Sequence, residues 1–374
     1  MKMPGNLLAP LKRFAAEASG EIGLHLSNER ANLVQFENSN NGPRIRAAAS
    51  LPYPCTREQL LADPRRLKAL LSQARSEHDF KGRRVVSCLH AAELQIFPIS
   101  YTAAEGQEEA VAILGELRER LKGALDASVI DYLPIRTEDG DSARREALVA
   151  VASRESVLRH LDLLENAGLQ ASAIDIGPAA LARLVSFVNR TDKRDQHPNA
   201  LVINFGRAKS YLSVVWGRRL ILDREIEFGE QVLVQRVVRL LGMGEDLAVR
   251  LLQECGFRSD PAHGGNDPEM AQTLKEVLRP ELATLTAEVN KTLIYTASRS
   301  RGRSIDQIYL LGSIGRYPGI DRLILEMLAV PVEVLNPFRA FGSRLGEAEL
   351  ARLRPIAGIA LACGLALRGF DHHA

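Results

Sequence analysis

The sequence predicts an α/β protein made of two similar domains that face each other across a cleft. A pattern of three short apolar runs, separated by polar or glycine-containing turns, occurs twice, which is typical of antiparallel strands. The first copy begins at Glu21 and the second at Ala200, and a separation of roughly 180 residues suits a duplicated domain better than a solenoid repeat. Apolar residues at helical spacing follow each copy, which adds helices to both domains. Paired domains of this kind hold a ligand between them.

The composition agrees with two globular domains and excludes several classes of protein. A chain of 374 residues with 46% hydrophobic and 25% charged residues is expected to form about two domains with substantial cores. The net charge of +2 provides no general attraction for nucleic acid. The four cysteines are far apart, which argues against a zinc site or a disulfide framework and fits a reducing cytoplasm. We find no apolar run long enough to span a membrane and no signal-peptide pattern.

Residues 1–19 are predicted to form an N-terminal arm outside the fold. Apolar and basic residues are mixed there: Leu7, Leu8, Leu11 and Phe14 with Lys2, Lys12 and Arg13. The arm is either a short helix that lies on a membrane surface or a loosely held terminal segment. Pro10 weakens the first interpretation.

The first domain is predicted from residues 20–93 and 169–190. Its strands are expected at 21–27, 31–37, 44–51, 84–89 and 171–176, and its helices at 57–77 and 178–189. In the helix over 57–77, five leucines lie on one side and the Asp63-Pro64 pair lies near the start.

Residues 94–168 are predicted to be a small α+β subdomain inserted into the first domain. The order is strand 94–99, helix 106–125, strands 129–134 and 147–152, and a second helix. Ser153 can cap that second helix and Gly168 can end it. Its apolar face is expected to contain Val157, Leu158, Leu161 and Leu164.

The second domain is predicted over residues 191–374, with a helical part at about 229–300. Residues 191–199 are a linker and residues 258–268 a surface loop. Strands are expected at 200–205, 210–216, 219–223, 307–311 and 332–335, and helices at 229–241, 271–298, 318–328 and 355–367. Pro280 should bend the long helix or begin a new segment. The last helix is rich in Ala and Gly, which suits close packing, so we expect it to cross back onto the first domain.

The turn over residues 311–319 is the strongest single motif for ligand binding. It lies between a predicted strand and a predicted helix. Gly312 and Gly315 allow the backbone to approach a flat ligand, and Pro318 favours the start of the helix. As a glycine pattern alone it has little specificity.

Four segments together resemble the actin-like ATPase superfamily that includes FtsA. These are IDQIYLLGSIGRYPGIDRLILEMLAVPVEVLNPF at 305–338, EALVAVASRESVLRHLDLLENAGLQASAIDIGPAALARL at 146–184, DREIEFGEQ at 223–231 and IAGIALACGLALR near the C-terminus. The segments look most like the pilus-assembly branch of PilM and its MshI-type relatives. The resemblance spans about residues 20–370.

The resemblance implies an actin-like fold of two RNase H-like domains around a cleft, with ATP or ADP and Mg²⁺ as ligands. It assigns nucleotide-binding roles to residues in three turns and on the long helix. These residues are Gly23, Ser27, Asn28, Asn204, Gly206, Lys209, Glu288, Lys291, Gly312, Ser313 and Gly315. For Glu288 and Lys291, an exposed ion pair between residues one helical turn apart is an equally good interpretation.

The two phosphate loops depart from the family pattern at the residues that matter most. His25 and Asn204 stand where the family has aspartates, which organise Mg²⁺ through carboxylate oxygens. Ser27 replaces a glycine and Asn32 a lysine, and the nearby Glu29 would repel a phosphate. Arg207 and Lys209 either attract an anion or form a solvated surface turn. We therefore expect nucleotide binding to be weak or lost, with no catalytic residue and no metal ligand.

The remaining polar clusters are weaker candidates for function. Arg299, Arg301 and Arg303 lack interleaved aromatic residues and fit a solvated loop better than a nucleic-acid surface. His263 has no nucleophile motif beside it, and His372 and His373 end the chain.

Four functions can be weighed against this sequence. The resemblance implies a cytoplasmic adaptor of a type IV or MSHA-type pilus assembly platform, peripheral at the inner membrane. Such an adaptor binds the N-terminal cytoplasmic tail of a PilN-like inner-membrane protein in a groove between the first domain and the inserted subdomain. Its membrane association is therefore indirect. The sequence is also compatible with a homo-oligomer. An active ATPase of the same fold is the alternative. A sugar or acetate kinase lacks support in the loops, and a type II secretion protein would be expected to continue into a membrane span.

Overall fold

The computed structural model describes residues 19–103, 106–121, 125–135, 145–189, 198–258, 268–299 and 303–373. The N-terminal arm up to residue 18, most of the predicted linker and loop, and His263 and Arg301 lie outside these ranges. The side chains of Arg299, His372 and His373 are likewise not described.

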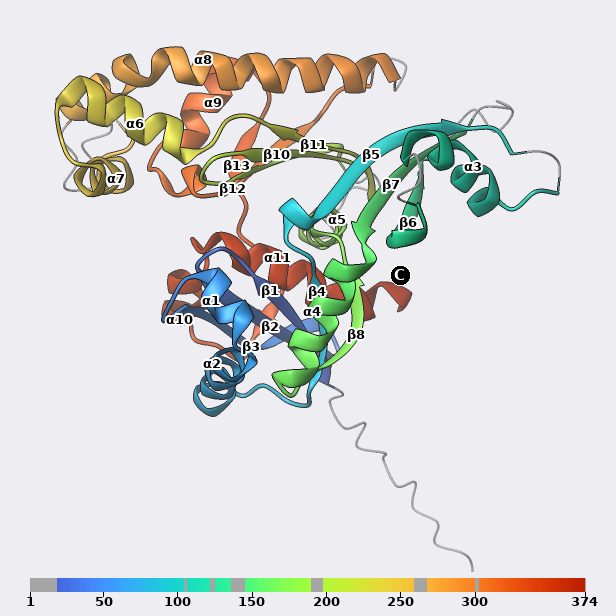
Figure 1. Cartoon of the computed structure of the whole chain (residues 1–374). Helices are drawn as coiled ribbons and strands as arrows, with labels where there is room; N and C mark the ends of the chain where they lie inside the picture. The colour runs from blue at the N-terminus through green and yellow to red at the C-terminus, as the bar shows by residue number, and fades with distance from the viewer. Residues whose placement is uncertain are drawn as a thin grey trace, which may run out of the picture.

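The first domain is built on a six-stranded sheet with the order β14-β3-β2-β1-β4-β8 (Figure 1). Its strands are β1 Ser19–Leu26, β2 Arg30–Ser39, β3 Gly42–Pro52, β4 Arg84–Cys88, β8 Gln170–Asp175 and β14 Gly342–Ser343. The three predicted meander strands pair antiparallel, and β4 and β8 add parallel to β1. The short strand β14, which the sequence analysis did not predict, joins the C-terminal part of the chain to β3.

The predicted helix over residues 57–77 is two helices, so that prediction was wrong. They are α1 Arg57–Ala62 and α2 Pro64–Glu77. Asp63 between them is extended, with φ −127° and ψ 94°, and its side chain accepts a hydrogen bond from the Arg65 amide. Proline disfavours helical backbone in the residue before it and fits the first position of a new helix, so Pro64 ends α1 and begins α2.

A separate three-stranded sheet forms the inserted part, with the order β5-β7-β6. Its elements are β5 Leu94–Tyr101, α3 Glu109–Leu121, β6 Ser128–Ile135 and β7 Arg145–Ser153. Helix α3 packs on one face through a core that includes Ile113, Leu117 and Val149. The pairing is antiparallel throughout, and β5 and β6 are the two edges.

Helix α4, Arg154–Asn166, leads from the small sheet back to the first domain. The predicted cap is confirmed, because Ser153 Oγ accepts a hydrogen bond from the Ser156 amide at 3.0 Å. The predicted apolar face was wrong in part, since Leu158 is 52% exposed, whereas His160, Leu163 and Leu164 are buried. The reason is that Leu163 and Leu164 pack into the core of the first domain, which selects a different face of the helix.

The second domain repeats the arrangement of the first, with a sheet in the order β11-β10-β9-β12-β13. Its strands are β9 Ala200–Phe205, β10 Ser210–Trp216, β11 Arg219–Ile226, β12 Gln307–Gly312 and β13 Val332–Val334. Its helices are α6 Glu230–Leu241, α7 Glu245–Glu254, α8 Pro268–Arg299 and α9 Ile320–Leu328. Helix α7 was not predicted. Helix α8 continues through Pro280, so no new segment begins there.

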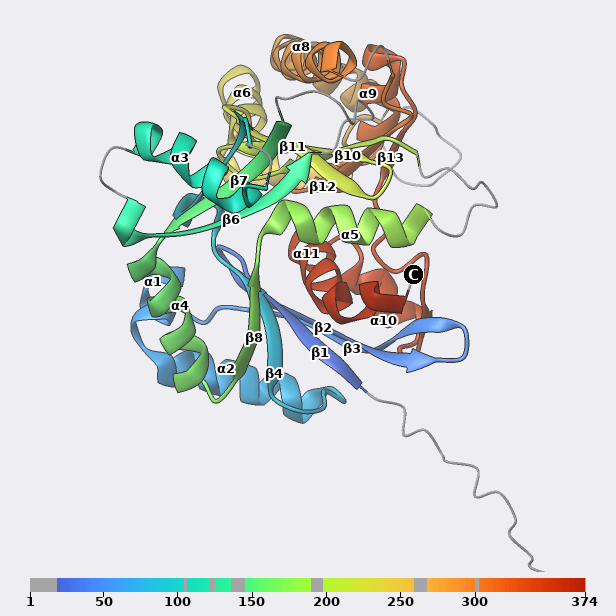
Figure 2. The same ribbon diagram turned by 90° about the vertical axis from the view of Figure 1, so that its right-hand side faces the viewer.

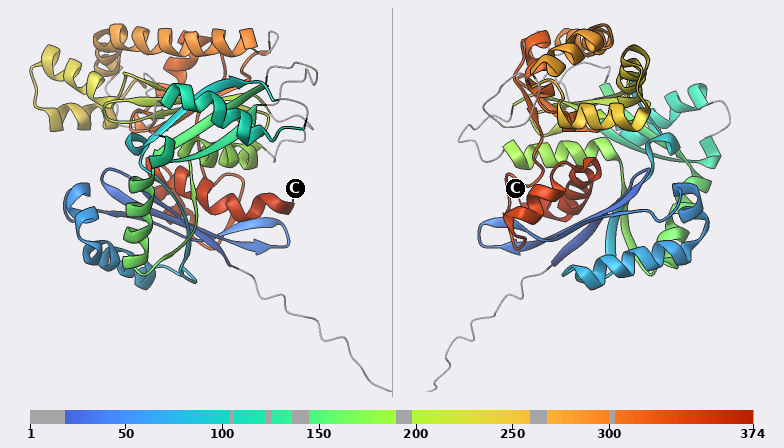
Figure 3. Two further views of the ribbon diagram at one scale, coloured as in Figure 1. Left: turned by 45° about the vertical axis from the view of Figure 1, so that its right-hand side comes forward. Right: turned by 90° about the vertical axis from the view of Figure 1, so that its left-hand side faces the viewer.

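Two helices lie between the two large sheets, as Figure 2 shows. They are α5 Gly177–Asn189 and α11 Ala357–Ala366, and they share one core with residues of both sheets. The predicted return of the last helix is confirmed, because α11 packs directly on β1. The short helix α10, Glu347–Leu353, precedes it, and the views in Figure 3 show both near the first sheet.

No single helix in the described part of the chain is long and apolar enough to cross a membrane. Helix α10 and the segment Ala357–Phe370 are long and apolar enough only when they are taken together, and the two are bent by 109° relative to each other.

Candidate functional site

The predicted site residues lie at or beside three turns and on helix α8, except Gly23, which lies within strand β1. The first turn joins β1 to β2, the second joins β9 to β10, and the third follows β12. Strands β9 and β12 pair in parallel with Phe205 opposite Gly312, which brings the second and third turns together. The first turn belongs to the other large sheet.

The first turn is closed by its own hydrogen bonds. Ser27 Oγ accepts from the Arg30 amide at 3.1 Å, and Tyr53 donates to the Ser27 carbonyl at 3.0 Å. Asn28 Oδ1 lies 2.8 Å from His90 Nε2. The side-chain oxygens of Ser27 and Asn28 therefore already have partners within the protein.

The two residues that replace an aspartate and a lysine pack against the start of α11. A Cβ atom at Gly358 would lie 2.1 Å from Asn32 Nδ2 and 2.9 Å from His25 Nδ1. Burial lowers the pKa of His25 to about 4, so the imidazole is neutral at pH 7. Asn32 is fully buried and accepts a hydrogen bond from Ser50 Oγ at 2.7 Å. Neither side chain offers charge to a metal ion or a phosphate.

The second turn carries two cations that are paired with carboxylates. Lys209 Nζ lies 2.9 Å from Glu227 and also donates a hydrogen bond to Glu225, and this bond to Glu225 is the main cause that raises the pKa of Lys209. Arg207 lies 3.0 Å from Glu245. An incoming anion would have to compete with these carboxylates.

The third turn is shaped by close contact with the second. Gly312 has φ +89°, and a Cβ there would lie 2.0 Å from the Phe205 carbonyl oxygen, so glycine is required at this position. Ser313 donates its amide to the Phe205 carbonyl at 2.9 Å and its hydroxyl to the Gly206 carbonyl at 3.2 Å. Gly315 has more room, since the nearest atom to an added Cβ would be 3.7 Å away.

Glu288 and Lys291 are tied to a different part of the second sheet. Their side chains form an ion pair at 2.5 Å, and Glu288 also binds Arg224 of β11. Two strands, β10 and β9, separate β11 from β12, where Gly312 ends the strand. The structure therefore brings Asn204, Gly206, Gly312 and Ser313 together, and it places Glu288 and Lys291 over the sheet edge.

The family of this chain follows from its match to known proteins. Residues 23–370 match the family model described as type IV pilus assembly protein PilM. The chain belongs to the PilM family. A solved structure described as a PilM-PilN type IV pilus biogenesis complex is 24% identical, covers 95% of this chain and 99% of that chain, and has a TM-score of 0.71. The ethanolamine utilization protein EutJ from Carboxydothermus hydrogenoformans is 11% identical over 94% of this chain and 89% of that chain, with a TM-score of 0.51. The predicted actin-like fold of this PilM-family chain is thus confirmed.

The sequence analysis missed a group of polar residues beside the first turn. Arg57 at the start of α1, His90 after β4 and His160 on α4 lie near Asn28 and His25. The one local signal was that His90 follows a buried strand, because residues at the carboxyl ends of parallel strands gather at one edge of a sheet. The positions of Arg57 and His160 depend on contacts between distant segments.

Proposed function

We propose that this chain is an adaptor of a type IV pilus assembly platform, of the MSHA type, that binds the N-terminal cytoplasmic tail of a PilN-like inner-membrane protein. Membership of the PilM family supports the pilus assignment, and the similar solved structure is described as a complex with PilN. In this proposal the protein works at the cytoplasmic face of the inner membrane through its partner. The nucleotide site is degenerate.

The observation that carries the proposal is an open strand edge on the inserted subdomain, which we place at residues 94–168. Strand β6 pairs with β7 alone among the strands that the structure describes. Val129 and Leu133 lie on the same face of β6, and their side chains are 42% and 36% exposed. An extended peptide gains main-chain hydrogen bonds along such an edge and can place alternate apolar side chains against the exposed ones.

The position of these side chains supports a tail that lies between the subdomain and the first domain. Ile130 and Tyr132 point to the opposite face, where they pack with the core under α3. Leu133 pairs with Leu148, which belongs to the central core with α5 and α11. The exposed face of β6 is therefore on the side of the central core, and helix α4, which packs on the first domain, also contacts β6.

The loops support a degenerate nucleotide site rather than an active ATPase. The donor atoms do not fit a bound Mg²⁺–nucleotide, since His25 and Asn204 replace carboxylates and Arg207 and Lys209 are already paired. No group of three His, Cys, Asp or Glu side chains in the described ranges is arranged to hold a metal ion. Of the family's nucleotide binding, this chain can retain weak binding of adenosine at the Gly312–Gly315 turn.

We expect no ATP hydrolysis above background. Losing the electrostatic stabilisation that a metal ion supplies raises the barrier by several kcal/mol, which corresponds to a loss of a thousandfold or more. A phosphate-release assay with Mg²⁺–ATP measures the hydrolysis rate. The test variant Ser313→Arg places a large side chain at the third turn. The control Ser298→Arg places the same side chain on the exposed surface of α8. Turnover that Ser313→Arg removes and Ser298→Arg preserves would refute the degenerate site.

We expect a labelled PilN-type tail of about ten residues to bind with micromolar affinity, because ordering the peptide offsets much of its contact energy. Leu133→Asp should weaken binding at least about tenfold, since it places a charge where an apolar contact forms. Fluorescence anisotropy measures the affinity.

The matched control for this experiment is Leu240→Asp on α6, which changes a leucine that is 49% exposed and far from β6 along the chain. Tail binding should be unchanged in that variant, and both variants should keep the thermal stability of the parent. Absence of binding, or an equal loss in both variants, would rule out the β6 edge as the docking strand.

A further inference from the structure

The guanidinium of Arg57 is largely buried without the partners that a buried arginine needs. Its side chain is 17% exposed, and its Nε atom is buried with no hydrogen-bond partner among the described residues. The nearest carboxylate oxygen, Glu93 Oε2, is 4.0 Å from Nη2, at the limit of an ion pair. Arginine has five N–H donors, and buried donors in proteins almost always have acceptors. Arg57 thus has donors available for a further group.

The neighbouring side chains are engaged elsewhere. The other oxygen of Glu93 lies 3.4 Å from Arg159 Nη2. His90 Nε2 is 2.8 Å from Asn28 Oδ1, and His160 Nε2 is 3.1 Å from Ser87 Oγ. Burial is the main cause that lowers the pKa of His90 and of His160, and the charge of Arg57 contributes to both shifts. This region therefore holds one poorly compensated positive charge among neutral imidazoles.

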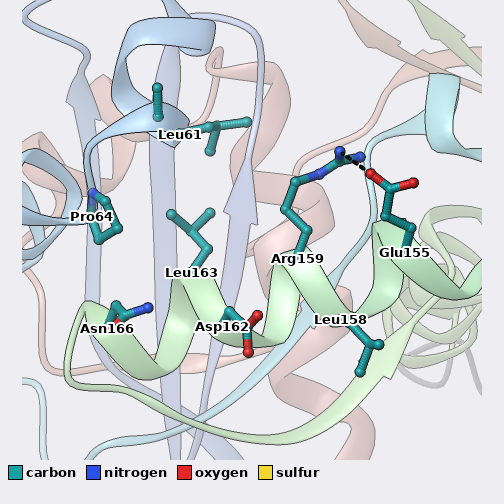
Figure 4. Close-up of a pocket in the computed structure, with 9 residues that line it drawn as sticks. Leu61, Pro64, Glu155, Leu158, Arg159, Asp162, Leu163 and Asn166 are labelled. Atoms are coloured by element: carbon teal, nitrogen blue, oxygen red, sulfur yellow. Dashed lines mark hydrogen bonds and ion pairs between the residues drawn. The ribbon is translucent and has the colours of Figure 1, made fainter.

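A surface groove lies one helical turn from Arg57, which is not itself among the residues that line it. Figure 4 shows its lining residues, which include Leu61, Leu163 and Arg159, between α4 and the α1–α2 junction. The volume of the groove is about 360 Å³. Leu61 follows Arg57 by one turn of α1, so both lie on the same side of that helix. Arg159 reaches the same Glu93 that faces Arg57. Leu61 and Glu93 thus link Arg57 to the residues that line the groove.

We propose that Arg57 is the centre of a binding site for a small oxyanion, a phosphate or a carboxylate group that enters from this groove. The planar guanidinium can donate two parallel hydrogen bonds to either group, and these would satisfy Nε. The site lies on the first domain, whereas the Gly312 turn lies on the second. It does not depend on the binding of a PilN-like tail.

The test compares thermal unfolding of the full chain in orthophosphate, acetate and chloride at one ionic strength. At an oxyanion concentration about ten times Kd, the wild-type melting temperature should rise by about 2–4 °C over that in chloride. Arg57→Gln should lose this rise. Arg75→Gln should keep it, because it removes an exposed arginine in the last turn of α2 that does not line the groove.

The two oxyanions identify the source of the ligand group. A rise with orthophosphate alone indicates a phosphate ligand, and a rise with acetate as well indicates that a carboxylate also fits. If Arg57→Gln does not fold, Arg57→Lys is the second variant, because lysine keeps the positive charge but lacks the planar guanidinium that donates two parallel hydrogen bonds. Arg57→Lys should bind orthophosphate at least about tenfold more weakly than wild type, as measured by calorimetry. Equal rises in wild type and the Arg57 variants, or no rise in wild type at tens of millimolar oxyanion, would overturn the proposal.

Discussion

Replacing Gly23 by valine should lower the free energy of unfolding by more than about 4 kcal/mol, or prevent folding. A Cβ atom at Gly23 would lie 2.0 Å from the Ala362 carbonyl oxygen and 2.5 Å from the Ala366 amide nitrogen. Both contacts are to the backbone of α11, which cannot yield by changing a rotamer, so the helix would have to leave β1. Chemical denaturation followed by circular dichroism measures the effect.

The control for Gly23→Val is Gly115→Ala on α3. An added Cβ there meets no atom within 4 Å, and alanine favours a helix over glycine by up to about 1 kcal/mol. Gly115→Ala should therefore stabilise the protein. If Gly23→Val unfolded at the same denaturant concentration as wild type, the close packing of α11 on β1 would be incorrect. The glycine that the family resemblance assigned to the nucleotide site thus has a structural reason of its own.

Replacing Glu37 by glutamine should cost about 3–5 kcal/mol of stability. Glu37 is fully buried on β2, and its carboxylate lies 2.8 Å from Arg46 and 2.5 Å from both Arg44 and Arg344. Burial acts to raise the pKa of this carboxyl, but hydrogen bonds from Arg344 and Arg44 outweigh it and hold the pKa below its usual range. An amide cannot compensate three guanidinium groups. Arg344 follows β14, so the C-terminal segment should also loosen from β3.

The pH dependence of this contribution follows from the direction of the shift. Because the pKa of Glu37 is lowered on folding, its stabilisation is present above the ordinary value of 4.5 and is lost as the pH falls below it. Denaturation of wild type and Glu37→Gln at neutral and acidic pH should show the difference shrinking with acidification. Glu116→Gln, at an exposed position on α3, should change stability by less than about 0.5 kcal/mol at either pH. A Glu37→Gln effect as small as that of Glu116→Gln would contradict the buried arginine cluster.

Local sequence patterns determined most of the elements and the fold class. The two meanders, the cap at Ser153 and the leucine stripe of α8 lie where apolar spacing and capping residues placed them. These features depend on neighbours within one or two turns of chain, and such interactions are readable in the sequence. The Ala and Gly content of the last helix also indicated close packing, because only small residues let two backbones approach.

The candidate site was predictable only as a set of turns. The sequence identified Asn204, Gly206, Gly312 and Ser313, and the pairing of β9 with β12 brings them together. It did not show that Lys209 is bound to Glu225 and Glu227, since solvated and paired cations look alike in a sequence. It also did not identify Arg57.

The sequence by itself determined the periodicity of each element, and the tertiary structure decided which face of each element is used. Helix α4 has apolar residues on more than one side, so the sequence did not show which side is buried. In the structure, Leu163 and Leu164 pack into the core of the first domain, and Leu158 is exposed. The open edge of β6 and the buried, unpartnered Nε of Arg57 likewise arise from strand order and from helices that meet across long sequence separations. Such contacts form only when the chain closes large loops, and no local residue pattern encodes which partners will meet.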